Sequence, residues 1–125
     1  MIKRNLCFAV PVVLFMSFAA FPHTLEGTWI SNGPNNSKVV LDFKPNGDFK
    51  VTVGKDVENQ GRYEFKLDTF KMYDNNCGAN VAGMYKITFY TADSASFTLI
   101  SDPCKSRSEE VDGGRIKRVS GSADH

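Results

Sequence analysis

The sequence predicts an all-β domain, an eight-stranded antiparallel up-and-down β-barrel that follows an N-terminal signal segment. Ten Phe, four Tyr and one Trp, set among Val and Thr, supply the aromatic and β-branched residues that favour strands. No segment shows helical periodicity long enough to cover a sheet, so the strands must bury one another. Closure of the meander removes the two exposed edges that an open sheet would leave. A flat sandwich of seven or eight strands is the alternative.

Residues 1–19 have the pattern of a secretory signal peptide: a short basic head, an apolar run and small residues at Ser17 and Ala19. We expect cleavage after Ala19 and a secreted or periplasmic protein. The alternative is an uncleaved membrane anchor, for which the apolar run falls short of the ~20 residues that a spanning helix needs. The remaining chain divides into a lead-in at 20–24, the barrel at 25–119 and a flexible tail at 120–125.

The charge of the mature chain limits its partners. Cleavage removes Lys3 and Arg4, which leaves 13 basic and 14 acidic residues and a net charge of −1. Nucleic-acid binding needs a strongly basic surface, so we expect no nucleic-acid partner. We also expect no membrane span once the signal is removed, and a monomer that could contact another protein.

Two cysteines remain in the mature chain. Cleavage removes Cys7 and leaves Cys77 and Cys104 as an even pair in a protein destined for an oxidising compartment. We predict that they form a disulfide, which would contribute about 3 to 4 kcal/mol in the chain-entropy model. Two free thiols, or half of a metal site, are the alternatives.

Eight short runs, several of them alternating apolar and polar residues, define the predicted strands. They span residues 25–32, 38–44, 49–53, 62–67, 70–74, 83–91, 96–101 and 114–119. The first run carries the step Gly27-Thr28-Trp29 and ends at a dense loop signal. The second and third form a hairpin, because the turn residues 45–48 separate two alternating runs.

The fourth and fifth strands follow a polar loop at 54–60. In the fourth, Tyr63 and Phe65 alternate strictly with charged residues, which defines its inner face. Residues 68–69 turn the chain into the fifth strand.

The last three strands are placed by the same alternation. Tyr85 and Ile87 share one face of the sixth strand, and Phe97 and Leu99 point inward from the seventh. The long loop 102–113 leads to the eighth.

Connection lengths separate the two ends of the barrel, because successive connections in a meander alternate between its ends. The connections 45–48, 68–69 and 92–94 are short, whereas those after the first, third, fifth and seventh strands are longer. We therefore expect one closed end and one looped end. Cys77 and Cys104 both fall at the looped end, where a bridge can join them.

Trp29 and Arg118 lie near the closed end on the first and last strands, which are neighbours in a closed barrel. If both point inward, the guanidinium lies over the indole face and hydrogen-bonds to the first strand. A cation over Trp contributes about 0.5 to 2 kcal/mol. With Gly27, these residues are our candidates for structural closure of the barrel. The alternative is that Arg118 is a solvated edge residue.

Taken together, the Gly27-Thr28-Trp29 step, the meander with alternating connection lengths and the late Arg118 resemble the lipocalin and lipocalin-like barrels. The Cys77-Gly78 loop, the run Gly83-Met84-Tyr85 and the residues that flank Cys104 resemble small secreted bacterial lipocalin-like domains. The resemblance implies a barrel that binds a small ligand. This sequence departs from full-length lipocalins in size, since its strands are shorter and no helix is expected after the barrel. The difference argues against a roomy ligand-binding cup.

The chemistry of enzymes is poorly represented. The mature chain has only His23 and His125, both outside the predicted barrel, so no Ser or Cys nucleophile has a histidine at hand. The same absence argues against haem and zinc. Acidic residues at the looped end lack a calcium-binding spacing and are interleaved with Lys105 and Arg107. We expect no enzyme, no cofactor and no metal.

The barrel interior is the best candidate site, because eight strands enclose either a filled core or room for one small ligand. So many large inward residues favour filling, and a small apolar cavity near the looped end is the alternative. A buried phenol needs a partner that a ligand could supply. Arg107 could meet an anionic group, or could pin its loop through backbone carbonyls. The candidate ligand-binding residues are Val39, Leu41, Val53, Tyr63, Phe65, Met72, Tyr85, Ile87, Leu99 and Arg107.

We therefore expect a non-catalytic barrel that binds a small, mainly apolar ligand at its looped end. The second hypothesis is a protein-interaction or inhibitor module with a solid barrel, which acts through loops AB, CD, EF and GH, the connections after the first, third, fifth and seventh strands. An internal cavity of a few hundred Å³ would separate the two hypotheses.

Overall fold

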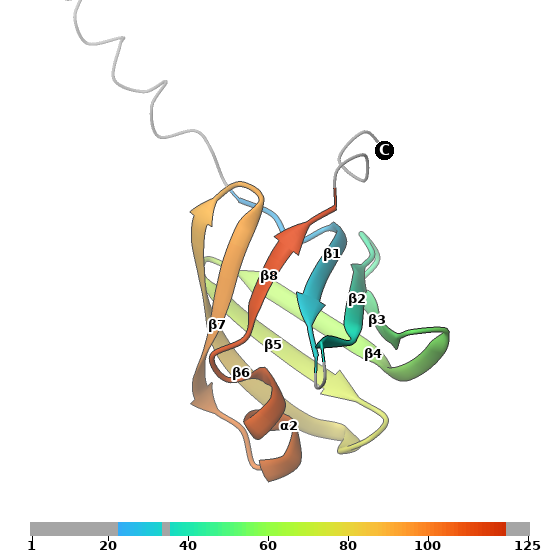
Figure 1. Cartoon of the computed structure of the whole chain (residues 1–125). Coiled ribbons are helices and arrows are strands. Elements are labelled where there is room, and N and C mark those ends of the chain that lie inside the picture. Colours follow the sequence, from blue (N-terminus) through green and yellow to red (C-terminus); the bar gives the residue numbers. More distant parts are fainter. Residues whose placement is uncertain (1–22, 34–35, 120–125) are drawn as a thin grey trace, which may run out of the picture.

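The computed structural model describes residues 23–33 and 36–119, which form one closed antiparallel β-barrel (Figure 1). The strands follow one another around it in chain order: β1 (Gly27–Asn32), β2 (Lys38–Phe43), β3 (Asp48–Val53), β4 (Asp56–Lys66), β5 (Thr69–Asp74), β6 (Gly78–Thr91), β7 (Ser94–Ser101) and β8 (Arg115–Arg118). β8 pairs back with β1. The predicted fold class is confirmed, and the sandwich alternative is excluded. The predicted signal peptide at 1–19 and tail at 120–125 lie outside the described residues.

The hairpin of β2 and β3 shows how local sequence sets the register. Lys44 donates its backbone N–H to the carbonyl of Asp48 at 2.8 Å across a tight turn. Gly47 in that turn has φ of 96°, which glycine adopts without a Cβ clash. Phe43 therefore stands opposite Phe49, and alternate residues of both strands point into the barrel.

The connection between β3 and β4 is shorter than the sequence predicts. The predicted loop 54–60 is mostly strand: β4 begins at Asp56, opposite Val53, and only Gly54 and Lys55 form the turn. Backbone hydrogen bonds to β3 hold this extension, which carries polar residues on both faces. Its pattern therefore gave no apolar alternation from which a strand could be recognised.

The connection between β5 and β6 is also short. β6 begins at Gly78 instead of Gly83, and residues 75–77 join it to Asp74 at the end of β5. The predicted contrast in connection lengths therefore holds only for 33–37 and 102–114. The strand ends that these two connections join lie at the open end of the barrel, opposite the closed end, where β1 begins and β8 ends.

The connection between β7 and β8 contains a short helix, α2 (Lys105–Val111), where the sequence predicted an irregular loop. It lies at the open end of the barrel (Figure 1). Seven residues make only two turns, too few for a helical period to be recognised among loop residues. Within the described part of the chain, no helix is both long and apolar enough to cross a membrane.

Aromatic rings dominate the core. Trp29, on β1, is fully buried and donates its indole N–H to the carbonyl of Leu25 at 2.9 Å. Phe43 contacts Tyr63 and Phe70 edge-on, with ring centroids 5.1 and 5.7 Å apart. Edge-on contacts of this kind stabilise beyond the area that they bury. The buried core residues are Leu25, Trp29, Phe43, Phe49, Phe70, Met72, Tyr85, Ile87, Ala95, Phe97 and Ile116.

Arg118 covers Trp29 at the closed end. Its guanidinium carbon lies 4.3 Å from the centre of the indole ring. The guanidinium donates to the carbonyls of Thr24 at 2.9 Å and Glu26 at 2.7 Å, and pairs with Asp93 at 3.1 Å. The side chain thus joins β8, the segment before β1 and the turn between β6 and β7. Gly27 begins β1 beside it with φ of 123°.

Candidate ligand-binding site

Aliphatic side chains line the barrel near its open end. Val39 and Leu41 on β2 stand opposite Val53 and Val51 on β3, and all four line a cavity of about 770 Å³. The floor of the cavity is formed by the rings of Phe43, Phe49, Phe70 and Phe97. Small-molecule sites typically have volumes of about 300–1,000 Å³. The interior that the sequence favoured as filled is therefore open at this end.

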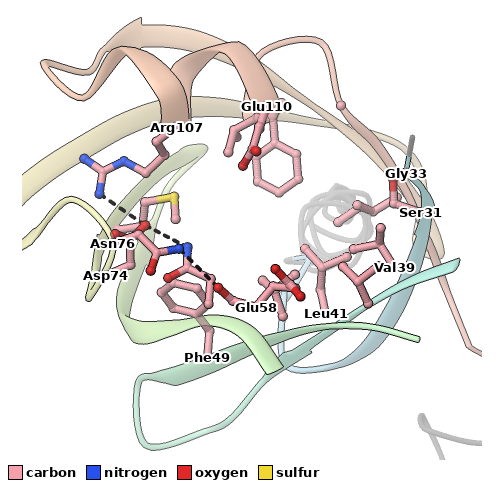
Figure 2. Close-up of a pocket in the computed structure, with 18 of the residues that line it drawn as sticks. Ser31, Gly33, Val39, Leu41, Phe49, Glu58, Asp74, Asn76, Arg107 and Glu110 are labelled. Carbon is pink, nitrogen blue, oxygen red and sulfur yellow. Dashed lines mark hydrogen bonds and ion pairs between the residues drawn. The ribbon is translucent and has the colours of Figure 1, made fainter. Parts of the chain in front are cut away.

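The mouth of the cavity lies between α2 and the ends of several strands (Figure 2). Arg107 and Glu110 belong to α2, and Glu58 to the extension of β4. Ser31 and Gly33, at the end of β1, form another part of the rim. The two corrections to the predicted fold, the helix and the longer β4, thus supply much of the mouth.

Half of the predicted ligand-binding residues line this cavity: Val39, Leu41, Val53, Met72 and Arg107. The other half do not: Tyr63, Phe65, Tyr85, Ile87 and Leu99. Strand alternation identified inward residues, but it did not show how far along the barrel axis the open space extends.

Tyr63 and Phe65 lie toward the closed end. The Tyr63 hydroxyl donates to the carbonyl of Lys44 at 2.7 Å, so its partner is the turn between β2 and β3. Burial, with the nearby Glu26 carboxylate, raises the pKa of Tyr63. Phe65 packs edge-on against Phe89, with ring centroids 6.0 Å apart. Both residues stabilise the packed half of the barrel.

Tyr85 and Ile87 are buried in the core of the barrel. Leu99 was expected beside them, yet it is 38% exposed. The register between β6 and β7 shifts next to Tyr85, and the backbone N–H of Leu99 donates to a carboxylate oxygen of Asp112 at 2.9 Å instead of to β8. Leu99 still stands opposite Tyr85, in register with the pair of Phe97 and Ile87, and its exposure goes with its place near the end of β7.

Arg107 is buried among two carboxylates, and only 4% of it is exposed. Its Nε and Nη2 each lie 2.8 Å from an oxygen of Asp102 in a bidentate pair. Nη1 lies 3.4 Å from Asp74, and Nη2 also donates to the carbonyl of Val81 at 2.9 Å. The side chain therefore anchors α2 to the ends of β5, β6 and β7. Its contacts agree with the loop-pinning alternative more than with a free anion receptor.

Protonation in this cluster follows from the pairing. Burial alone would raise the pKa of Asp102, but hydrogen bonds from Arg107, Tyr85 and the backbone of Cys104 outweigh it and hold that pKa below its usual value. Burial and the hydrogen bond to Asp102 raise the pKa of the Tyr85 phenol. Hydrogen bonding to Asp102 raises the pKa of Arg107. Tyr85 finds its partner in a carboxylate of the chain itself.

Sequence reasoning missed the roles of Asp74 and Asp102 because both lie where strands end. Asp74 is 1% exposed and accepts hydrogen bonds from Asn59 and from the backbone of Cys77, each at 2.9 Å. Gly83 leaves the space for the ion pair, since a Cβ there would lie 2.6 Å from an oxygen of Asp102. A glycine within an otherwise regular strand was the one available signal of such a close approach.

The predicted disulfide is confirmed. Cys77 and Cys104 are joined with their Cα atoms 6.0 Å apart. Cys104 immediately precedes α2, and Cys77 immediately precedes β6 and lines the cavity. The bridge and Arg107 thus fix the same helix beside the mouth. Within residues 23–33 and 36–119, no three His, Cys, Asp or Glu side chains are grouped as metal ligands.

The class of protein that these observations define is a closed eight-stranded up-and-down β-barrel with a cavity open at one end. Its architecture is compatible with a lipocalin-like fold. Comparison of the chain with models of known protein families, with curated proteins and with solved structures finds no significant match.

Proposed function

We propose that this protein is a secreted or periplasmic lipocalin-like barrel that binds a small, mainly apolar molecule without transforming it. The cavity of about 770 Å³ is the observation that carries the proposal. Its wall is aliphatic and its floor aromatic, so a ligand would gain about 25 cal/mol for each Å² of apolar surface that it buries. Because the rim is polar and the wall beneath it is aliphatic, such a molecule would enter the cavity with its apolar part first.

Three features support the proposed secreted or periplasmic location and the lipocalin-like classification. The disulfide between Cys77 and Cys104 is of a kind that persists in oxidising compartments. The predicted signal at 1–19 would direct the chain there. The stacking of Arg118 on Trp29 joins two of the residues on which the resemblance to lipocalins rests.

The first test is a native mass spectrum of the protein exported from cells and purified without detergent. We expect a monomer that carries an added mass, and that this mass is lost on denaturation. A clean apo monomer that also binds no apolar fluorescent dye, measured by fluorescence titration, would contradict the proposal.

A cavity-filling variant tests whether the ligand binds in this cavity. Val39 lines the cavity but is not part of the packed core, so Val39→Phe would extend into free space. We expect it to weaken dye binding at least ten-fold with little loss of stability. Val40→Phe is the matched control, since Val40 neighbours Val39 on the opposite face of β2 and does not line the cavity. Equal effects of the two variants would place the ligand elsewhere.

A further inference from the structure

The charges around the cavity mouth are unbalanced. Glu58, Glu109 and Glu110 line the cavity, and Figure 2 shows Glu58 and Glu110 on opposite sides of the opening. All three are exposed at the rim. Among the described residues, none of their carboxylates forms an ion pair or a hydrogen bond. The rim therefore presents negative charge from both β4 and α2 to anything that enters.

The basic side chain that lines the cavity does not offset this charge. Arg107 forms a bidentate pair with Asp102 and an ion pair with Asp74, so two carboxylates already face one guanidinium. Lys38, Lys55 and Lys105, at the same end of the barrel, are exposed and do not line the cavity. Negative charge at the mouth of a low-dielectric cavity raises the local concentration of cations and repels anions.

The cavity below the rim suits the apolar body of such a ligand. Its aliphatic wall and the rings of Phe43, Phe49, Phe70 and Phe97 on its floor offer apolar contact beneath the charged mouth. A free carboxylate ligand would place a further negative charge beside Glu58 and Glu110. The one guanidinium lining the cavity, that of Arg107, has an Nη1 without a hydrogen bond, but it already faces the carboxylates of Asp74 and Asp102.

We propose that the cavity selects an apolar molecule that carries a positively charged amine, with its apolar body in the barrel and its ammonium group between Glu58 and Glu110. This inference rests on the proposed ligand-binding function and specifies the ligand class. It gives a role to the length of β4, whose extension carries Glu58 to the rim.

The test compares three probes with one twelve-carbon chain and different head groups: dodecylamine, dodecanol and dodecanoate. Each is titrated below its critical micelle concentration by displacement of an uncharged apolar dye at neutral pH. We expect dodecylamine to bind about five-fold more tightly than dodecanol, as two partly screened ion pairs would provide, and dodecanoate to bind most weakly. Raising the salt concentration should reduce only the advantage of the amine.

The double variant Glu58→Gln with Glu110→Gln locates the effect. It should remove most of the preference for dodecylamine over dodecanol and leave dodecanol binding unchanged. Glu64→Gln is the matched control, because Glu64 is an exposed carboxylate on the same β4 strand that does not line the cavity. It should behave like the wild type.

The outcomes separate the two proposals. Equal binding of the three probes, tighter binding of dodecanoate, or an unchanged preference in the double variant would overturn the amine inference and leave the binding barrel standing. Failure of all three probes and of the dye to bind the folded, disulfide-bonded protein would overturn both.

Discussion

The two ends of the barrel each contain a partly or fully buried arginine, and the two are used in opposite ways. At the closed end, Arg118 stacks on Trp29 and donates to backbone carbonyls, and aromatic rings fill the interior. At the open end, Arg107 is held by two carboxylates and fixes a helix beside a cavity. Whether the barrel interior is filled depends on the size of the neighbouring inward residues. Indole and phenyl rings fill the closed half, whereas valines leave the other half open.

The largest expected effect is at the closed end. Trp29→Ala removes a fully buried indole on which Arg118 stacks, and should lower the free energy of unfolding by about 3 to 5 kcal/mol. Urea unfolding followed by tyrosine fluorescence measures it. A loss below about 1 kcal/mol would show that this half is not the stabilising one.

The next effect belongs to the open end. Replacing both Cys77 and Cys104 by Ser should lower the free energy of unfolding by about 3 kcal/mol, because the bridge restricts the unfolded chain. Far-ultraviolet circular dichroism should retain its strand signal, while amide exchange in α2 accelerates. An unchanged melting temperature would argue against the bridge.

Tyr85→Phe should cost about 2 kcal/mol, because it removes a hydrogen bond to the buried Asp102 carboxylate. The folded pKa of Asp102 lies below its unfolded value of about 3.9, so the stability that this group contributes is present above that value and is lost as pH falls through the folded pKa. Without the phenol the folded pKa rises towards 3.9, and less stability remains to be lost in acid.

Denaturant unfolding from pH 7 to pH 2 measures this difference. Tyr63→Phe is the control, since its hydroxyl donates to a backbone carbonyl and not to a carboxylate. It should lower stability without changing the shape of the pH profile. Parallel profiles for the wild type and Tyr85→Phe would contradict the pairing with Asp102.

The smallest effect is expected at the cavity wall. Val39→Ala removes two methyl groups from a half-buried residue beside open space, and should cost about 1 kcal/mol or less. Thermal unfolding beside Trp29→Ala gives the contrast between the two ends directly. A loss above about 3 kcal/mol would mean that the upper barrel is tightly packed.

The alternation of apolar and polar residues predicted the barrel strands, because an inward residue needs an apolar neighbour on the next strand and not one particular residue. Tyr63 and Phe65 showed the inner face of β4, but the polar residues before them gave no such signal, since backbone pairing alone extends that strand. The register shift beside Tyr85, beyond its pairing with Leu99, likewise has no pattern in the sequence.

The site was harder to predict than the fold because it depends on depth and on long-range pairs. Val39 and Tyr63 both alternate inward, yet one lines the cavity and the other packs below it. The partners of Arg107 come from the ends of separate strands, and no local spacing connects Asp74 with Asp102. The cysteine pair was the exception, since the two cysteines that follow the predicted signal segment leave one pairing.

The seam between β1 and β8 has a consequence for the order of folding. Every other pair of neighbouring strands is joined by a local connection, whereas the bond from Arg118 to the carbonyl of Glu26 links residues 92 positions apart. Bringing together residues so far apart in the chain costs loop-closure entropy before the contact can contribute stability. We therefore expect the meander to form first as an open sheet. Arg118 then holds β8 against β1 when the sheet closes into the barrel.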